Sequence, residues 1–361
     1  MASRAVAVRD ADSVGILGTG SCLPGNVVTN DDVGAPAGVT DQWIRRKTAI
    51  HERRWAKSDE TTSDLAAMAA RMALHDAGVR AEDVTLILVA TSTPDSPQPP
   101  TATAVAAELG VPAGTPAFDV NAVCSGFVFA LTAAESMIRG SGGHAVVIGA
   151  DIYSRTLDPA DRRTVVLFGD GAGAVVLGPT RGDGVIATRL ATFPEERGLI
   201  RVPAGGSQIP ASAASVEQGL HYFTMDGPAV RRFVESRVAP LIRSFVDTHV
   251  PDRARPLHFV PHQANGRMIE SLSADLGFLP ERTHTTVRFF GNTGAASVPI
   301  TLDRAAGRIT PGDLVVLAGF GGGMAAGLAL VEWQAPRARR TGPGAGLDES
   351  AAGSVARPVN A

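Results

Sequence analysis

The stretch Asp119-Val-Asn-Ala-Val-Cys-Ser-Gly-Phe127 joins an apolar, strand-like run to a long apolar helix through small residues. Cys124 stands at this junction, where the amide dipoles of a helix N-terminus favour a thiolate over a thiol. A free thiol near pH 7 is only slightly ionised, so we expect the junction to bring the pKa of Cys124 close to the working pH. The alternative is a buried structural cysteine, which most lone cysteines are.

Two polar segments further along the chain favour the catalytic interpretation. His262 stands in Val260-Pro-His-Gln-Ala-Asn265, and Asn292 stands in Gly291-Asn-Thr-Gly-Ala-Ala-Ser297. A thiol with an imidazole and a carboxamide beside it can attack a carbonyl and hold the negative charge that develops on oxygen. The sequence therefore predicts nucleophilic catalysis, provided that the three segments meet in space.

Composition and charge indicate an enzyme without nucleic-acid or membrane partners. The chain has 361 residues, 44% of them hydrophobic, and a formal net charge of -3, which offers no polyanion-binding signature. No stretch approaches the roughly 18 apolar residues that span a bilayer, and the N-terminus lacks an apolar signal region, so we expect a cytoplasmic protein. Cys22 and Cys124 are the two cysteines, without a spaced Cys/His set, and we expect neither a metal site nor a disulfide.

The chain repeats one pattern of helices and strands. An alanine-rich helix ending at Gly78 precedes a strand-like run at 84–90, and a helix with i, i+3, i+4 apolar spacing over 230–245 precedes another at 256–260. A further helix start follows each strand by about 35 residues, at Cys124 and at Asn292. Duplication of one α/β unit explains this pattern and places the reactive loops at a shared cleft. Chance similarity between two α/β halves is the alternative.

The duplication suggests a boundary between the two halves near Gly178 to Gly184. We assign residues 1–180 to the half that carries the cysteine and residues 181–335 to the half that carries His262 and Asn292. Residues 336–361 are rich in Ala, Gly, Pro, Arg and Ser, with almost no large apolar side chains, and we predict a disordered tail.

Three glycine-rich runs are candidates for cofactor or oxyanion sites. Gly15-Ile-Leu-Gly-Thr-Gly20 lacks the third glycine of a dinucleotide fingerprint, and Pro24 interrupts the helix that would follow. Phe168-Gly-Asp-Gly-Ala-Gly173 lacks the lysine of a P-loop and is predicted as a tight turn before a strand. Gly319-Phe-Gly-Gly-Gly323 follows a buried strand, where backbone amides can approach an oxyanion; a simple strand-end loop is the alternative.

In this order the segments resemble the β-ketoacyl-acyl carrier protein synthase III family of the thiolase-like fold. The resemblance runs from Gly15 to Trp333 and covers nearly everything except the tail. It includes the catalytic segments, the last two glycine runs, and the stretches that begin Asp41-Gln-Trp-Ile-Arg, Asp158-Pro-Ala-Asp-Arg and Phe223-Thr-Met-Asp-Gly. It implies an α/β fold whose duplicated halves form five layers, α/β/α/β/α, and a homodimer. Acyl-coenzyme A (acyl-CoA) would be a substrate, and no cofactor is implied.

Missing residues separate this chain from other branches of the same fold. A thiolase would carry a second catalytic cysteine, and none follows Cys124. Elongating ketosynthases have a second histidine where this chain has Asn292, and chalcone-synthase-like enzymes have a proline in the glycine loop that differs here at Gly322. The resemblance therefore favours the branch that condenses starter units.

The resemblance implies two half-reactions at the three catalytic side chains. Cys124 would attack the thioester of acyl-CoA, with the backbone amides of Cys124 and Gly322 as the oxyanion hole. Malonyl-acyl carrier protein would then lose carbon dioxide, and a neutral His262 together with Asn292 would donate hydrogen bonds to the enolate oxygen. Phe320 would pack beside the malonyl carboxylate, where desolvation favours loss of charge.

Matching family positions give roles in substrate delivery. Trp43 and Arg162 would flank the adenine, Lys47 would lie near the phosphates, Asn265 would bind the pantetheine arm, and Arg267 would dock an acidic carrier protein. We expect a further group of cations to add positive charge near the same entrance, although surface arginines are also typical of any solvated face. This group comprises Arg45, Arg46, Arg53 and Arg54.

Departures from the family pattern leave the acyl substrate open. Gln98 occupies the position of an aromatic gate in the acyl pocket, and Lys47 replaces an arginine, losing its bidentate phosphate grip. A tryptophan common after the last glycine loop is missing. The chain has two lysines among many arginines and alanines, a composition of high-GC genomes, in which such enzymes often start polyketides rather than fatty acids.

Three functions follow from these observations. The first is a condensing enzyme that joins an acyl group on Cys124 to malonyl-acyl carrier protein. The second is an acyltransferase that moves the same acyl group to a hydroxyl or amine without decarboxylation. The third is a non-catalytic partner subunit, which the presence of Cys124, His262 and Asn292 together argues against.

Overall fold

Two β-sheets form the centre of the computed structural model, which describes residues 13–251 and 254–334. The first sheet has the strand order β1-β7-β6-β4-β5, and the second has the order β11-β12-β13-β8. The strands of the first are β1 (Val14–Cys22), β4 (Val84–Ala90), β5 (Ala117–Val120), β6 (His144–Asp151) and β7 (Gly171–Pro179). Those of the second are β8 (Val185–Thr192), β11 (Leu257–Pro261), β12 (Leu314–Gly321) and β13 (Ala325–Glu332).

The two sheets have the same topology, which confirms the duplication. β4 pairs parallel with β6, as β11 does with β12, and the antiparallel pairs that follow, β6 with β7 and β7 with β1, match β12 with β13 and β13 with β8. A parallel bridge between Phe259 and Thr283 takes the place beside β11 that β5 takes beside β4. The chain passes from the first sheet to the second between Pro179 and Val185, within the segment where we placed the boundary. The predicted tail, 336–361, lies outside the described residues.

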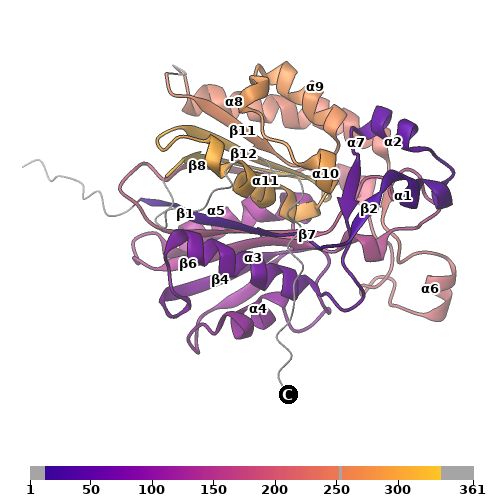
Figure 1. Ribbon diagram of the computed structural model, residues 1–361, viewed down its shortest axis with the longest axis horizontal. Helices are drawn as coiled ribbons and strands as arrows, with labels where there is room; N and C mark the ends of the chain where they lie inside the picture. Colours follow the sequence, from indigo (N-terminus) through magenta and orange to yellow (C-terminus); the bar gives the residue numbers. More distant parts are fainter. Residues whose placement is uncertain (1–12, 252–253, 335–361) are drawn as a thin grey trace, which may run out of the picture.

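Helices cover both sheets and fill the space between them, giving the five layers α/β/α/β/α (Figure 1). The outer face of the first sheet carries α3 (Thr62–Ala77) and α4 (Thr101–Leu109), and that of the second carries α8 (Ala239–His249) and α9 (Gly266–Leu276). Between the sheets lie α5 (Gly126–Ile138) and α11 (Ser297–Ala305), whose apolar side chains share one core with strands of both sheets. No helix in the described ranges is long and apolar enough to cross a bilayer.

Local signals explain most helix boundaries. In α3, Thr61 and Asp64 form a capping box at the start, and Gly78 adopts the left-handed conformation that ends the helix where the sequence predicted. The apolar pattern over 230–245 predicted one helix, but the structure divides it into α7 (Gly227–Phe233), a π-helical segment η5 (Val234–Val238) and α8. Pro240 has no N–H to donate to the preceding turn, so the regular helical ladder cannot continue through this segment.

Shorter elements gather beside the sheets at one end of the molecule (Figure 1). They are β2 (Val27–Thr29), α1 (Asn30–Ala37), α2 (Asp41–Thr48), β3 (Glu52–Arg54), β9 (Ile200–Arg201), α6 (Ala213–Glu217), β10 (Thr224–Met225) and α10 (Val287–Phe290).

Arg53 connects two segments at this end of the molecule, and its burial corrects one prediction. Its side chain is fully buried, and Nη2 donates to the carbonyl oxygen of Val166 at 2.8 Å, so Arg53 links β3 to the segment that precedes β7. The expectation that Arg53 adds surface charge at a substrate entrance is therefore wrong, because Arg53 is the inward-facing residue of the short strand β3. Arg54 is also largely buried, and its charge is paired with that of Glu52.

The central helices lie so close to the sheets that some sheet positions have no room for a side chain. A Cβ placed on Gly173 of β7 would lie 2.5 Å from the backbone nitrogen of Ile300 and 2.8 Å from the carbonyl carbon of Pro299, both in α11. Such distances exclude any residue larger than glycine unless the helix moves. Because α11 follows directly after the Asn292 segment, this packing also sets the position of Asn292.

We predict that Gly173→Ala destabilises the fold by about 1–3 kcal/mol, because overpacking forces α11 away from β7. Chemical denaturation measures the free energy of unfolding. Gly307→Ala is the matched control: nothing lies within 4 Å of its Cβ, so the free energy should stay within about 0.5 kcal/mol of the wild-type value. Equal effects of the two substitutions would contradict the packing argument.

Candidate active site

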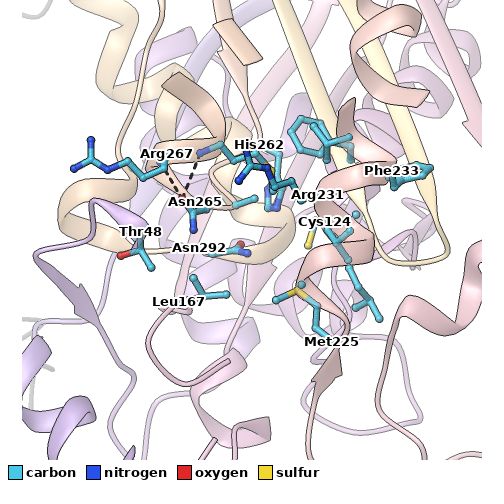
Figure 2. Close-up of a pocket in the computed structure, with 18 of the residues that line it drawn as sticks. Thr48, Cys124, Leu167, Met225, Arg231, Phe233, His262, Asn265, Arg267 and Asn292 are labelled. Carbon is cyan, nitrogen blue, oxygen red and sulfur yellow. Dashed lines mark hydrogen bonds between the residues drawn. The ribbon is translucent and has the colours of Figure 1, made fainter. Parts of the chain in front are cut away.

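One cavity of about 870 Å³ receives Cys124, His262 and Asn292, which come from different parts of the chain (Figure 2). Cys124 lies in the 3₁₀ turn η2 (Val123–Ser125) before α5, His262 follows β11, and Asn292 follows α10. Their side chains are only 5%, 2% and 5% exposed, respectively, although all three line the cavity. The fold explains why Cys124 and Asn292 converge. The turn η2 directly precedes α5 and the Asn292 segment directly precedes α11, and these two helices lie side by side between the sheets.

The backbone around Cys124 is strained. Val123, a β-branched residue, has φ of 47°, a left-handed conformation that such residues rarely adopt. The strained turn places Cys124 at the start of α5 with its sulfur toward the cavity, and the backbone amides of Cys124 and Gly322 both donate hydrogen bonds to that sulfur. Strain of this kind is typical of functional sites, where surrounding packing maintains it.

The thiol does not have the lowered pKa that the sequence predicted. Complete burial, reinforced by the negative charge of Asp151, raises the pKa of Cys124 to about 12. The hydrogen bonds from the two amides and from Tyr153 lower the pKa, but the effect of burial is larger. The helix N-terminus is therefore present as predicted, yet it does not by itself produce a thiolate at neutral pH in the unliganded protein.

His262 is held as a neutral imidazole. Its Nδ1 lies 2.7 Å from Oγ of Ser297, and burial lowers the pKa of His262 to about 3. If the Ser297 hydroxyl donates to Nδ1, the remaining ring proton is on Nε2, the tautomer that can donate a hydrogen bond to an oxygen. The ring of Phe320 stands edge-on to His262, with 5.5 Å between centroids, and also lines the cavity.

Asn292 is fixed through its backbone and its side-chain oxygen. Its amide donates to the carbonyl of Leu167 at 2.8 Å, and its carbonyl accepts from Gly169 at 3.0 Å. Its Oδ1 accepts from the amide of Gly294 at 3.0 Å, which orients the Nδ2 amino group as the donor available to a ligand. The site thus presents two neutral donors, from His262 and Asn292, beside a nucleophilic sulfur.

The side chains predicted to bind the coenzyme and the carrier protein lie toward the mouth of the same cavity. Trp43, Lys47, Arg162, Asn265 and Arg267 all contribute to its lining. Asn265 caps α9, its Oδ1 accepting from the amide of Arg267, while its Nδ2 donates to the carbonyl of Lys47 at 3.3 Å. Arg267 pairs with Glu270 at 2.9 Å, with both side chains exposed.

Two predicted positions do not line the cavity. Gln98 is exposed in the loop before α4, so the structure does not place it in an acyl pocket of its own chain, because a proline-rich run keeps this loop at the surface. Gly322 is also absent from the lining, although its amide reaches the Cys124 sulfur and its neighbour Gly321 does line the cavity. The first three residues of the glycine run 319–323 belong to a strand and not to a loop, since β12 continues to Gly321.

Sequence reasoning missed several residues of the site. Ser297 stood within the quoted Asn292 segment, and its hydroxyl could have been considered as a partner for a buried histidine. Tyr153 contacts the nucleophile and Arg231 lines the cavity, but neither stood in a recognised pattern. In the described part of the chain, no group of three or more His, Cys, Asp or Glu residues is arranged to hold a metal ion.

Comparison with known proteins agrees with this geometry. Residues 118–194 match the family model 3-oxoacyl-[acyl-carrier-protein] synthase III, and residues 257–333 match the model of its C-terminal part. The chain is 58% identical over 324 residues to acetoacetyl CoA synthase NphT7 of Streptomyces sp. strain CL190, covering 88% of this chain and 98% of that protein. The chain belongs to the 3-oxoacyl-[acyl-carrier-protein] synthase III family.

Other members of the synthase III family share both sequence and fold with the chain. The β-ketoacyl-[acyl-carrier-protein] synthase III of Neisseria meningitidis serogroup A is 44% identical over 321 residues, covering 88% of this chain and 98% of the relative. The crystal structure of the Pseudomonas aeruginosa PAO1 enzyme superposes with a TM-score of 0.80 at 36% identity, covering 89% of this chain and 98% of that one. These similarities establish a ketosynthase-type enzyme with the thiolase-like fold.

We predict that Ser297→Ala lowers kcat for condensation by about tenfold, because His262 loses the hydrogen bond that fixes its tautomer. Steady-state kinetics with saturating substrates measures this effect. Ser136→Ala removes a hydroxyl from the exposed side of α5, where it donates to the carbonyl of Thr132, and should leave kcat unchanged. An unaltered kcat in the Ser297 variant would show that this hydrogen bond does not orient the catalytic imidazole.

Proposed function

We propose that this synthase III family member transfers an acyl group from acyl-CoA to Cys124 and condenses it with a malonyl thioester, with loss of carbon dioxide. The observation that carries the proposal is the convergence of Cys124, His262 and Asn292 on one cavity. A nucleophile and two neutral hydrogen-bond donors suit a reaction in which negative charge passes from sulfur to a thioester oxygen.

In the first half-reaction the Cys124 sulfur attacks the carbonyl carbon of the acyl thioester, and the coenzyme thiolate leaves. The oxygen of the tetrahedral intermediate takes the place near the amides of Cys124 and Gly322, which donate to the sulfur in the unliganded protein. Amides fixed by a strained turn and a β-strand end need little reorganisation, which is the source of their catalytic effect.

In the second half-reaction the malonyl carboxylate leaves as carbon dioxide, and the resulting enolate attacks the acyl-cysteine carbonyl. Nε2–H of His262 and Nδ2 of Asn292 donate to the enolate oxygen. A neutral imidazole suits this step, because an imidazolium would protonate the enolate or hold it too strongly. Phe320, packed against His262, keeps water from the region where the carboxylate loses its charge.

The positive mouth of the cavity supports a coenzyme A substrate. Lys47, Arg162, Arg163, Arg231 and Arg267 line the cavity, and Trp43 provides an aromatic surface beside them. Guanidinium groups pair well with phosphates, and an indole ring stacks on a base. We assign Trp43 and Arg162 to the adenine, and Lys47 to the phosphates.

The names of two relatives support a proposal for the malonyl carrier. The product named for the Streptomyces relative, acetoacetyl-CoA, retains coenzyme A, whereas the Neisseria relative is named for an acyl carrier protein. With 58% identity to the former and 44% to the latter, we infer acetyl-CoA as the acyl donor and malonyl-CoA as an acceptor used in addition to malonyl-acyl carrier protein. Arg267 is the residue we assign to docking of the acidic carrier.

We also infer that two copies of the chain associate. β5 is the last strand of the first sheet, its outer edge pairs with no other strand of the described residues, and Phe118 on it is 36% exposed. An open edge with an exposed aromatic residue is a typical strand-pairing surface. Light scattering coupled to size exclusion tests this assignment, with a mass of twice the chain expected.

We predict that His262→Ala and Asn292→Ala each lower the rate of carbon dioxide release from malonyl-CoA by about 10²–10³-fold, because each removes one donor to the enolate oxygen. The measurement is the release of labelled carbon dioxide from malonyl-CoA in the presence of the acyl-loaded enzyme. His75→Ala, at an exposed position of α3, is the matched control and should leave the rate unchanged.

The same assay separates the proposal from a transferase without decarboxylation. The condensing enzyme releases one carbon dioxide for each β-ketoacyl product, and that product is found on the carrier supplied as the malonyl thioester. Formation of an acyl ester or amide without carbon dioxide release would overturn condensation as the activity.

A further inference from the structure

Arg231 of α7 is a charged residue of the cavity wall that has no role in the two half-reactions described above. In α7 and the π-helical segment η5, the residues that line the cavity are small or apolar except Arg231 and Glu235. The Arg231 side chain is 69% exposed and also lines the cavity, so it lies where the cavity opens to solvent. Figure 2 shows it among the side chains around the cavity.

The guanidinium of Arg231 is held along one edge and free along another. Nε donates to Oε1 of Glu235 at 2.8 Å, about one helical turn further along the chain. This is the one side-chain hydrogen bond of Arg231 among the described residues, so Nη1 and Nη2 keep their donors for a ligand. An exposed ion pair of this kind contributes little to stability, and its effect here is to orient the guanidinium.

The acidic side chains of the cavity lining do not cancel its positive charge. Glu235 and Asp275 are the two acidic residues of the lining, and each is paired with an arginine. Asp275 accepts a hydrogen bond from Nη2 of Arg243 at 2.9 Å. Five cationic side chains, from arginines and one lysine, line the same cavity. An anion that enters the mouth therefore meets an excess of positive charge.

The neighbouring Arg232 shows what is particular to the position of Arg231. Arg232 belongs to the same helix and is exposed, but it does not line the cavity. A folded protein partner reaches exposed arginines from outside the cavity, whereas a ligand inside the cavity reaches Arg231. The position of Arg231 therefore favours an anionic group of the bound small molecule over the surface of a carrier protein.

A phosphate is the anion that suits the free edge of this guanidinium. Nη1 and Nη2 can donate two parallel hydrogen bonds to two phosphate oxygens. Lys47, on α2, offers a single ammonium and cannot form such a pair. Coenzyme A carries its phosphates at the end remote from the thioester, so they lie toward the mouth when the thioester reaches Cys124.

We propose that Arg231 binds a phosphate of coenzyme A thioesters at the mouth of the cavity and supplies the bidentate contact that Lys47 cannot make. This role deepens the proposed function, on which it rests, by naming a residue that selects coenzyme A as the carrier of the acyl and malonyl groups. The contact is remote from the bonds that change, so it stabilises the ground state and the transition state equally. Its loss raises KM and leaves kcat nearly unchanged.

The test compares Arg231→Ala with Arg232→Ala, which removes the adjacent arginine from outside the cavity. Isothermal titration calorimetry of the unacylated full-length chain with coenzyme A measures Kd. Arg231→Ala should raise this Kd by at least about tenfold, because two hydrogen bonds to a charged group are lost. Arg232→Ala should leave it nearly unchanged.

Steady-state kinetics gives a second measurement with a substrate that carries no phosphate. Arg231→Ala should raise KM for malonyl-CoA by about tenfold with little change in kcat, and its kcat/KM for malonyl-pantetheine should equal that of the wild type. Arg231→Lys keeps the charge without the bidentate geometry, so its KM for malonyl-CoA should lie between those of the wild type and Arg231→Ala.

An unchanged Kd for coenzyme A in Arg231→Ala would overturn the inference, as would an equal loss in Arg232→Ala or with malonyl-pantetheine. A loss confined to malonyl-acyl carrier protein would overturn it as well, because Arg231 would then dock the carrier. Calorimetry requires no turnover. A protein that binds coenzyme A through Arg231 but releases no carbon dioxide would therefore contradict the proposed function alone.

Discussion

The close packing of two helices between two sheets is the constraint on which the site depends. A Cβ added to Gly321 of β12 would lie 2.7 Å from Cβ of Cys124, so the second sheet approaches the nucleophile as closely as a residue without a side chain permits. On the opposite side, β7 approaches α11 in the same way. With both helices confined, the turn before α5 and the segment before α11 have little freedom, and their catalytic side chains are fixed relative to each other.

Burial then sets the protonation states of the catalytic groups, and it acts in opposite directions on the pKa values of sulfur and imidazole. The same exclusion of water that keeps His262 neutral, as an enolate requires, raises the pKa of Cys124 and disfavours its thiolate. A dry site suited to the second half-reaction is therefore unfavourable for ionisation of the thiol in the first.

Much of the fold and the three central residues could be predicted from the sequence, because their signals are local. Gly78 ends a helix, continuous apolar runs form strands, Cys124 and His262 each follow such a run, and Asn292 stands in a glycine-containing segment before a helix. The pKa of Cys124 could not be predicted, since it depends on burial beneath a sheet formed more than 100 residues away along the chain. The burial of Arg53 and the exposure of Gln98 are likewise consequences of packing between distant segments.

The substrate assignments rest on likeness to relatives, whereas the catalytic assignment rests on the geometry around one sulfur atom. The most direct test is to incubate the protein with acetyl-CoA alone and determine by intact-protein and peptide mass spectrometry where an acetyl group becomes attached. The account predicts one acetyl group on Cys124 and none on the Cys124→Ala variant. Acetylation at another residue, or a wild-type protein that remains unmodified, would contradict it.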